Sequence, residues 1–293
     1  MSLSTQALEY QLQLGNHPAK RLTKVGTLTP FGLLLSALTI LFAAGQVTAK
    51  SIRVMTYNIH VGVGMDKKLD LTRIASVINT QHPDLVGLQE VDRGVERTQR
   101  IDEIAELAKL TKMDYAFAFN LKYQGGQYGV AILSREPIRA TDHHLYLNKR
   151  EAERRGFIRA EVRIGGRLIS FVTTHLDYQY EDGRVFEAEQ LLAAIKDVKA
   201  PLIIVGDFND EPTGGAYKLM AKEFYDSWMQ VAYGQWLDGT DRNEGLTYPA
   251  DKPIKRIDYI FTRRSDGLKT KRVWNVETLA SDHVPVVADL QLP

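Results

Sequence analysis

Several apolar segments of this chain stop abruptly at a side chain that can bind a cation or move a proton. Segment 202–205 is the best example, because four aliphatic residues lead through Gly206 to Asp207 and Asn209. Such a run suits a β-strand covered on both faces, and ligands bind where the strands of an open α/β sheet end. Four more segments end on or near Asn58, Glu90, His175 and Asp258, and the pair Asp282-His283 stands directly before another apolar run.

The chemistry open to this set is that of hard ligands. Carboxylates, amides and imidazoles are present, and the absence of cysteine excludes thiolate ligands. Oxygen-rich sites with few nitrogens suit Mg²⁺ or Mn²⁺ rather than structural zinc. A metal of this kind polarises phosphoryl oxygens and neutralises a departing alkoxide. Each motif also has a structural interpretation when taken singly, because Gly-Asp often starts a turn and a lone histidine often serves only the fold.

Length and composition fit a globular domain with its own core. The 293 residues are 44% hydrophobic and 25% charged, enough to build a core without disulfides. The formal net charge is +1, and leaving out the first 49 residues leaves 34 basic and 35 acidic residues. This balance argues against a protein that wraps a polyanion over its whole surface, but it leaves a local basic patch open.

The first 49 residues are predicted to be a targeting segment. Basic residues within 20–24 precede an apolar run over 31–45, and 47–49 offers the small residues of a signal-peptidase site. The run is shorter than the roughly 20 residues that span a bilayer, which favours a cleaved export signal over an uncleaved membrane anchor. The polar lead is long for a signal peptide, so the anchor stays as the alternative. We expect residues 50–293 to form one periplasmic or secreted domain.

Hydrophobic periodicity predicts an α/β domain. Apolar residues at helical spacing predict a helix near 71–78 that Pro83 ends, and a second near 100–110 with Thr98 as its cap. Helices alternate with strands here, while Gly165-Gly166 predicts a hairpin, so the sheet must be mixed. Further helices are predicted at 184–198 and 217–223, and strands at 51–58, 84–91, 115–119, 129–134, 137–147, 157–164, 167–174, 202–205, 257–261, 273–276 and 284–290.

Seven motifs, taken in order, resemble those of the endonuclease/exonuclease/phosphatase superfamily of metal-dependent phosphoesterases. The match extends over residues 52–292, and the agreement in order gives it a specificity that no single motif has. The motifs are Thr56-Tyr57-Asn58-Ile59, Gln89-Glu90-Val91, Tyr128-Gly129-Val130-Ala131-Ile132-Leu133-Ser134-Arg135, Thr174-His175-Leu176, Gly206-Asp207-Phe208-Asn209, Arg256-Ile257-Asp258-Tyr259-Ile260 and Ser281-Asp282-His283-Val284-Pro285.

The resemblance implies a fold and a metal site. The fold is a four-layer α/β sandwich, in which two mixed β-sheets pack face to face with helices on the outside. Glu90 would be the principal metal carboxylate, Asn58 its neighbour on the metal or the phosphate, and Asp282 a further metal or outer-shell ligand. The ion would be Mg²⁺, with Mn²⁺ as an alternative.

The resemblance also implies catalytic roles. Asp207 would orient or deprotonate the attacking water, and His283 would be the essential imidazole. Asp258 would hold the tautomer of His283 and favour its charged form. Asn209 and His175 would contact the phosphate, His175 against its developing charge. Two weaker assignments are Arg159, as a phosphate contact or merely a residue flanking a strand, and Tyr128, as sheet packing rather than chemistry.

The predicted reaction is Mg²⁺-dependent hydrolysis of a phosphate ester by water, with a phosphodiester favoured. A nuclease would use basic clusters at 149–150, 154–155 and 263–264. A lipid or GPI-type headgroup phosphodiesterase fits the export signal, and residues 57–60 with the following Gly-containing loop resemble the hydrolase domain of GPI-lipid-remodelling proteins. Tyr178, Tyr180 and Trp236 would then meet a membrane surface, with ordinary packing as an equal alternative. A non-catalytic adaptor of the cell envelope is the third alternative. We expect a monomer.

Overall fold

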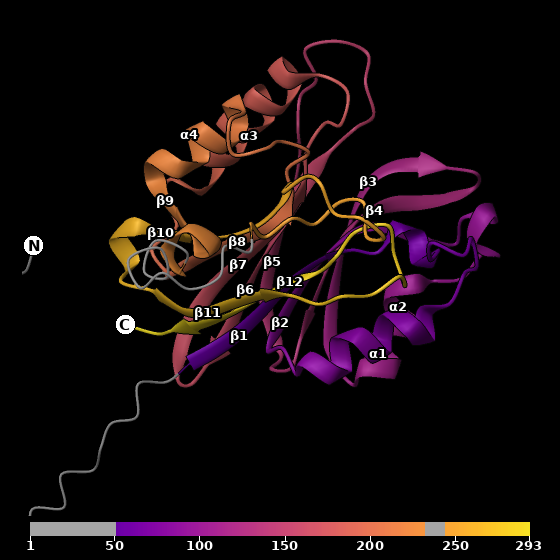
Figure 1. The fold of residues 1–293 in the computed structure, drawn as a ribbon, viewed down its shortest axis with the longest axis horizontal. Coiled ribbons are helices and arrows are strands. Elements are labelled where there is room, and N and C mark those ends of the chain that lie inside the picture. Colours follow the sequence, from indigo (N-terminus) through magenta and orange to yellow (C-terminus); the bar gives the residue numbers. More distant parts are fainter. Residues whose placement is uncertain (1–50, 232–243) are drawn as a thin grey trace, which may run out of the picture. The chain divides into compact units, whose positions relative to one another are not determined.

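Two six-stranded β-sheets form the body of the structure, a computed structural model that describes residues 51–231 and 244–293 (Figure 1). The first sheet has the order β11-β12-β1-β2-β4-β3 and the second the order β5-β6-β7-β8-β10-β9. The strands are β1 (Ser51–Asn58), β2 (Leu85–Arg93), β3 (Asp114–Tyr123), β4 (Gly126–Ser134), β5 (Ile138–Leu145), β6 (Gly156–Ile164), β7 (Arg167–His175), β8 (Leu202–Asp207), β9 (Phe224–Asp226), β10 (Asp258–Arg263), β11 (Lys269–Asn275) and β12 (Val286–Gln291). The α-helices are α1 (Leu71–Gln81), α2 (Glu103–Thr111), α3 (Glu181–Ile195) and α4 (Gly215–Glu223).

Three clusters of buried apolar side chains define the layers. Val54 and Ile203 belong to the cluster between the two sheets. Ile74 belongs to a second cluster, between the first sheet and α1 and α2, and Leu191 to a third, between the second sheet and α3 and α4. Figure 1 shows the two helix pairs on opposite sides of the stacked sheets. The predicted four-layer sandwich with two mixed sheets is therefore confirmed.

One parallel strand pair in each sheet positions the candidate catalytic and metal-binding residues. β1 runs parallel to β2, with Asn58 opposite Gln89, and β7 runs parallel to β8, with His175 opposite Asp207. The other strand pairs described are antiparallel. Parallel strands end at the same edge of a sheet, so each pair delivers its last side chains to one rim. Since β2 also packs against β7, the two rims meet.

The predicted hairpin turn is confirmed, and the predicted cap of α2 is wrong. Gly165 and Gly166 form the β6–β7 turn with φ of +63° and +83°, as a two-residue hairpin of this kind requires. Thr98 does not cap α2, because the helix starts later, at Glu103. The carboxylate of Asp102 caps it instead, by accepting a hydrogen bond from the backbone N–H of Ala105 (3.2 Å).

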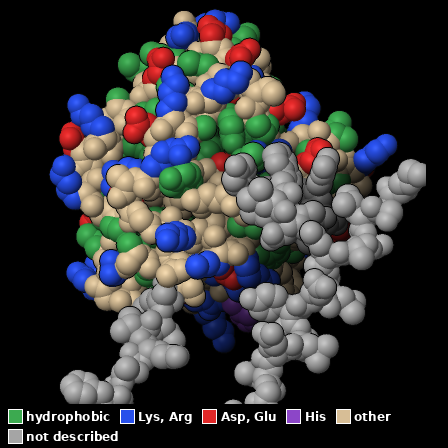
Figure 2. All heavy atoms as spheres, turned by 60° about the vertical axis from the view of Figure 1, so that its left-hand side comes forward, with side chains coloured by type: hydrophobic (Ala, Val, Ile, Leu, Met, Phe, Trp, Pro, Cys, Tyr) green, Lys and Arg blue, Asp and Glu red, His purple; other side chains and the backbone are tan. Residues whose placement is uncertain are grey.

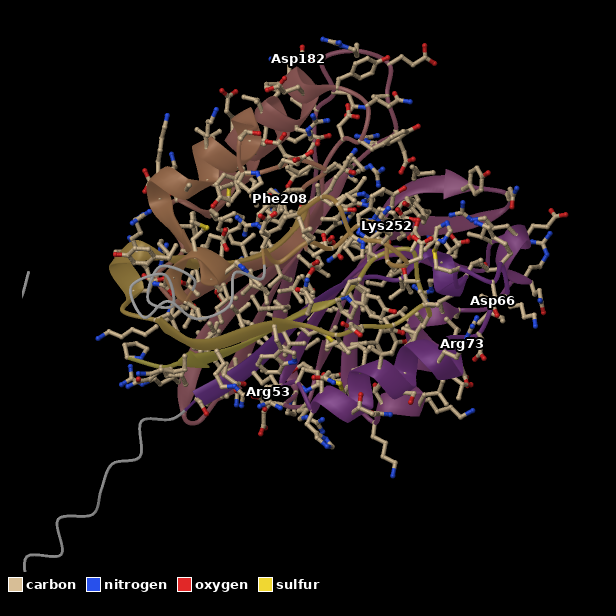
Figure 3. All side chains as sticks on the ribbon, in the orientation of Figure 1. Arg53, Asp66, Arg73, Asp182, Phe208 and Lys252 are labelled. Carbon is tan, nitrogen blue, oxygen red and sulfur yellow. The ribbon has the colours of Figure 1, made fainter. Side chains whose placement is uncertain are left out.

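Arg53 ties β1 to the elements on either side of it (Figure 3). Its Nε donates to Asp289 on β12 (2.7 Å), and its Nη1 donates to the carbonyl of Gln81 at the end of α1 (2.8 Å). Its backbone N–H donates to Asp84, which precedes β2 (2.7 Å). β1 is thereby fixed on both edges, which sets the position of Asn58 at its end.

The described residues contain no helix of the length and apolarity needed to cross a bilayer. The predicted targeting segment 1–49 and Trp236 lie outside the residues that the structure describes.

The close approach of the two sheets at Gly87 gives a first prediction. A Cβ at this position would lie 2.3 Å from Cγ2 of Val205 and 2.7 Å from Oγ1 of Thr173 on the facing sheet. We expect Gly87→Ala to lower the free energy of unfolding by about 1–3 kcal/mol, because it overpacks the core. Val205→Ala alone should also destabilise, by leaving a cavity.

The double variant separates overpacking from other effects. Val205→Ala removes the methyl groups nearest to the new Cβ, so the two changes together should cost less than the sum of the single costs in urea unfolding. Strictly additive costs would contradict a steric contact between the sheets.

Candidate active site

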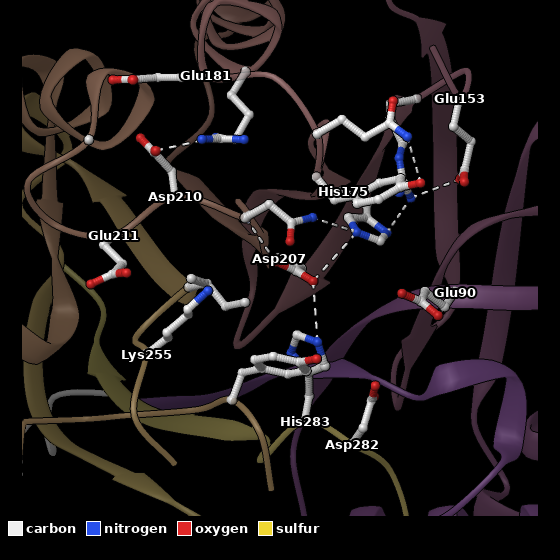
Figure 4. Close-up of a pocket in the computed structure, with 18 of the residues that line it drawn as sticks. Glu90, Glu153, His175, Glu181, Asp207, Asp210, Glu211, Lys255, Asp282 and His283 are labelled. Carbon is white, nitrogen blue, oxygen red and sulfur yellow. Dashed lines mark hydrogen bonds and ion pairs between the residues drawn. The ribbon is translucent and has the colours of Figure 1, made fainter.

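A pocket of about 930 Å³ opens where the two rims meet (Figure 4). It is lined by six of the side chains predicted from the sequence, which come from both sheets: Glu90, His175, Asp207, Asn209, Asp282 and His283. Asn58 and Asp258 are hydrogen-bonded to these residues and are themselves almost fully buried. The structure thus brings eight of the nine predicted residues together, and the exception is Arg159.

Glu90 reaches the pocket through an irregularity in β2. The register of β2 against β4 shifts between Leu88 and Val91, and Glu90 has φ of +56°. This left-handed conformation costs a non-glycine residue about 1 kcal/mol or more. A β-bulge re-aims side chains, and bulges are common beside active sites. The strain therefore coincides with the placement of a carboxylate on the pocket wall.

Asn58 holds two carboxylates together. Its Nδ2 donates to Oε1 of Glu90 and to Oδ2 of Asp207, both at 3.0 Å, while its Oδ1 accepts from the backbone N–H of His60 at 3.0 Å. In this arrangement the amide oxygen accepts one hydrogen bond and keeps a second lone pair. Asn58 therefore orients Glu90 and Asp207, and its Oδ1 could also contact a metal ion without turning the amide.

Asp258 and His283 form a buried pair that faces Asp207. Nδ1 of His283 lies 2.9 Å from Oδ2 of Asp258, and its Nε2 lies 3.7 Å from Oδ2 of Asp207. Burial by itself lowers the pKa of His283, but Asp258 and Asp207 outweigh it and raise the pKa to about 10. His283 is consequently a cation at neutral pH, held by Asp258 with one N–H directed to the pocket.

Asp207 carries its carboxylate at 1% exposure. Burial and the negative charge of Asp258 raise its pKa, and the cation of His283, the backbone N–H of Asn209 and the amide of Asn58 oppose that rise. The N–H of Asn209 donates to Oδ1 at 2.9 Å. A carboxyl group with a raised pKa is a better proton acceptor than an ordinary aspartate, which is what a general base needs.

His175 approaches Asp207 from the end of β7. Its Nε2 lies 3.4 Å from Oδ2 of Asp207 and 3.0 Å from Nδ2 of Asn209. Burial lowers the pKa of His175 well below its usual value, and the positive charges of Arg155 and His283 lower it further. The contact with Asp207 is therefore made by a neutral ring and is not an ion pair.

The acidic side chains fit a hard divalent cation. Asp207, Asp258 and His283 bring one ligand atom each within 4.8 Å of one another, a spacing that could hold a metal ion. Within this group Nδ1 of His283 is bonded to Oδ2 of Asp258. Glu90 and Asp282 face the same part of the pocket (Figure 4). Asp282 lies 3.8 Å from Nδ1 of His60, and within the described ranges no lysine or arginine is paired with Glu90. Glu90 and Asp282 are a second set of carboxylates that could hold the ion, and they are the ones expected from the sequence.

Arg159 does not reach the pocket. Its guanidinium is bonded to Asp142 and Glu161 on strands β5 and β6, a placement that fits the alternative of a residue flanking a strand rather than a phosphate contact. The sequence contains only weak indications for two other residues of the pocket wall, Arg155 and Tyr128. Arg155 stands out there only within the basic cluster 154–155. In the structure its side chain is 3% exposed, and its Nη1 lies 2.7 Å from Nδ1 of His175. Tyr128, expected to serve packing, lies 3.4 Å from the same Nη1 and lines the pocket.

Comparison with known proteins agrees with this geometry. The model of the endonuclease/exonuclease/phosphatase family matches residues 55–283. The chain belongs to this family. Its members are metal-dependent hydrolases of phosphate esters, so this chain is a phosphoesterase and the alternative of a non-catalytic adaptor is dropped.

Individual members of the family resemble the chain to different extents. The Escherichia coli K12 protein YbhP is 26% identical over 258 residues, which are 83% of this chain and 97% of YbhP. A Drosophila melanogaster protein provisionally named a neutral sphingomyelinase is 23% identical, over 78% of this chain and 58% of its own length. A Beutenbergia cavernae family structure superposes with a TM-score of 0.66 at 23% identity, over 83% of this chain and 72% of its own, and supports the fold.

The buried pair predicts a pH dependence. The pKa of His283 is about 10 in the folded protein and about 6.5 in an unfolded chain. The folded protein thus binds more protons between these values, so this pair's contribution to stability is complete below pH ~6.5 and is lost as the pH rises through about 10. Each unit of pKa difference corresponds to about 1.4 kcal/mol.

Asp258→Asn should lower the pKa of His283 by more than one unit, because it removes the charge that raises this pKa most. Histidine NMR titration of the metal-free protein measures the pKa, and the fall in Tm between pH 6 and 10 should become shallower. Asp142→Asn, which removes a half-exposed carboxylate paired with Arg159, is the control and should change neither. An unaltered His283 titration in Asp258→Asn would contradict the assignment.

Proposed function

We propose that the protein hydrolyses a phosphodiester by attack of water, with Asp207 as the general base. The observation that supports this most is the surroundings of Asp207: an almost fully buried carboxylate, oriented by Asn58 and Asn209, with an imidazole on either side. In the proposed step the water oxygen forms a bond to phosphorus, the bond to the leaving oxygen breaks, and Asp207 takes the proton of the water.

The remaining residues stabilise charge on the phosphoryl group. His283 is protonated and directs its Nε2–H to the pocket, while Asp258 keeps its Nδ1–H in place, so it can donate to a phosphoryl oxygen. Asn209 and His175 lie on the other side of Asp207 from His283 and would contact the same phosphoryl group. A divalent cation, for which we propose Mg²⁺ with Mn²⁺ as the alternative, would be held by Glu90 and Asp282 and would neutralise the leaving oxygen.

For the substrate we propose a lipid headgroup phosphodiester, including GPI-type headgroups. Large apolar side chains are exposed on four loops that also carry residues of the pocket wall. Leu147 is 66% exposed, Ile254 63%, Tyr178 55% and Leu279 55%. Exposed apolar groups around a polar pocket are typical of a surface that meets a partner or a membrane. The predicted export signal would place the enzyme near such a surface.

A nucleic-acid substrate has less support. Arg155 is buried, Arg150 is paired with Asp182, and Arg263 is paired with Asp266. On the face shown in Figure 2, basic side chains are interspersed with acidic and apolar ones and form no stripe. Seven acidic side chains line the pocket against four arginines and lysines and the protonated His283, an excess of negative charge that would repel a polyanion. The nuclease stays as the second candidate function and the substrate panel below tests it.

The catalytic assignment predicts that Asp207→Asn and His283→Ala each lower turnover of bis(p-nitrophenyl) phosphate by about 10²–10⁴-fold in the presence of Mg²⁺. EDTA should abolish the wild-type activity, and Mg²⁺ should restore it. Arg159→Met, on the same sheet but outside the pocket, is the control and should keep full activity. Wild-type turnover in Asp207→Asn would refute the proposed general base, and wild-type turnover in His283→Ala would refute the proposed role of the His283 imidazolium.

The substrate proposal predicts cleavage of sphingomyelin or phosphatidylinositol in vesicles, and no cleavage of DNA. Leu147→Asp combined with Ile254→Asp should lower vesicle turnover at least tenfold while sparing the soluble bis(p-nitrophenyl) phosphate. Met229→Asp, at a partly exposed apolar residue on another part of the surface, is the matched control. DNA cleavage without vesicle cleavage would replace the lipid assignment by the nuclease.

A further inference from the structure

Arg155 is a buried cation in the pocket wall. It precedes β6, whose first residue, Gly156, lies opposite His175 in the β6–β7 ladder. Nη1 of Arg155 lies 2.7 Å from Nδ1 of His175, and the same nitrogen lies 3.1 Å from Oε1 of Glu153 and 3.4 Å from the hydroxyl of Tyr128. At 3% exposure the guanidinium is fixed by these partners and is not free to meet solvent.

The chemistry of arginine decides which nitrogen of His175 carries hydrogen. A guanidinium stays protonated in proteins and has donors but no acceptor. At 2.7 Å, Nδ1 of His175 must therefore be the acceptor, because an N–H there would point at another N–H. A neutral imidazole has one hydrogen, so that hydrogen is on Nε2. A charged imidazolium would place two buried cations in contact, which burial strongly disfavours.

The opposite side of the ring leaves Nε2–H directed to the pocket. Two groups lie near it: Nδ2 of Asn209 at 3.0 Å and Oδ2 of Asp207 at 3.4 Å. Nδ2 of Asn209 also lies 3.0 Å from the carbonyl of Leu176, so in this orientation its two hydrogens point to that carbonyl and to Nε2. A neutral ring cannot accept at both nitrogens and also carry its hydrogen, so one of the two donors must turn away. The guanidinium is charged and its contact is shorter (2.7 Å against 3.0 Å), so Nε2 carries the hydrogen and the Asn209 amide turns, after which Oδ1 of Asn209, Asp207 or an oxygen atom that enters the pocket accepts it. The bond to Asp207 is long, and the donor is available to a second oxygen.

We propose that Arg155 is a positioning residue that holds His175 as the neutral tautomer with hydrogen on Nε2, so that this ring serves the site only as a hydrogen-bond donor. The low pKa of His175, which arises from burial, Arg155 and His283, agrees with a neutral ring. The charged groups that face the ring are Arg155, Asp207 and His283, with Glu153 behind Arg155. The tautomer rests on the contacts of Arg155 and Asn209 with the ring, whereas its effect on turnover rests on the proposed function.

The two histidines of the pocket would then have opposite roles, fixed by opposite partners. Asp258 accepts from Nδ1 of His283 and keeps that ring charged, while Arg155 donates to Nδ1 of His175 and keeps that ring neutral. Both rings direct an N–H toward Asp207 without taking its proton. Asp207 therefore remains free to receive a proton from water.

Long-range ¹H–¹⁵N NMR of histidine-labelled protein tests the tautomer without any turnover, because protonated and unprotonated ring nitrogens have well-separated shifts. The His175 signals are assigned by their loss in His175→Gln. We expect wild type to show an unprotonated Nδ1 and a protonated Nε2 from pH 5 to 9. In Arg155→Met, Nδ1 loses its donor, and the ring should become a mixture of tautomers that protonates within this range.

Turnover gives the second measurement. Arg155→Met should lower kcat about tenfold to a hundredfold with little change in KM, and its pH–kcat profile should gain an acid limb. Arg155→Lys keeps a charged donor and should recover part of the activity and the wild-type tautomer. Arg159→Met, an arginine on β6 outside the pocket, should behave as wild type in both measurements.

Several results would overturn the proposal. A wild-type spectrum with hydrogen on Nδ1 would refute it even if no Arg155 variant folds. An unchanged tautomer and pH profile in folded Arg155→Met would reduce Arg155 to a structural residue. If turnover is lost in all variants for reasons unrelated to His175, the spectrum still decides on the tautomer, so a failure here is distinguishable from a failure of the proposed function.

Discussion

The whole site depends on keeping one carboxylate, that of Asp207, in a place from which water is almost excluded. An isolated buried charge is strongly unfavourable, so this group needs donors on every side. Asn58 supplies one from β1 and Asn209 another from the loop after β8, and imidazoles approach from β7 and from the segment before β12. These donors come from both sheets. The stacking of the sheets and the chemistry of the pocket are therefore one constraint.

The topology meets this constraint with few elements. Helix α1 lies on the connection between the parallel strands β1 and β2, and α3 lies on that between β7 and β8, so four strand ends point to the same rim. The antiparallel strands β10 and β12 bring Asp258 to the start of one strand and His283 to just before another. A mixed sheet thus supplies both directions of approach, which an all-parallel sheet would not.

Much of this was predictable from the sequence, because buried strands leave a strong local pattern. Apolar runs that end at acids, amides or imidazoles identified eight residues that the fold brings together. The same reasoning failed where position depends on distant contacts. Arg159 and Arg155 are similar in the sequence, each near the start of β6, but only the packing of β6 against β7 decides that Arg155 points inward. Strand β9 has three residues, too few for any periodicity to be visible.

The hydropathy pattern also did not predict local backbone geometry. The sequence placed Glu90 at a strand end but gave no sign of its left-handed backbone, since nothing in the residue type demands it. The start of α2 was predicted early, because the apolar spacing continues upstream of the carboxylate that caps the helix. In both places the determining contact is a hydrogen bond or a steric limit that hydropathy does not record.

Because the register of β2 shifts, the number of residues in this strand decides where the side chain of Glu90 points. With one residue fewer between Leu88 and Val91, the ladder to β4 would be regular, the backbone relaxed and the sheet smoother. The side chain after Gln89 would then alternate in the ordinary way and would no longer be turned toward the pocket. The extra residue therefore adds backbone strain to the sheet, and a strand without it would keep the sandwich while turning the acid away from the pocket.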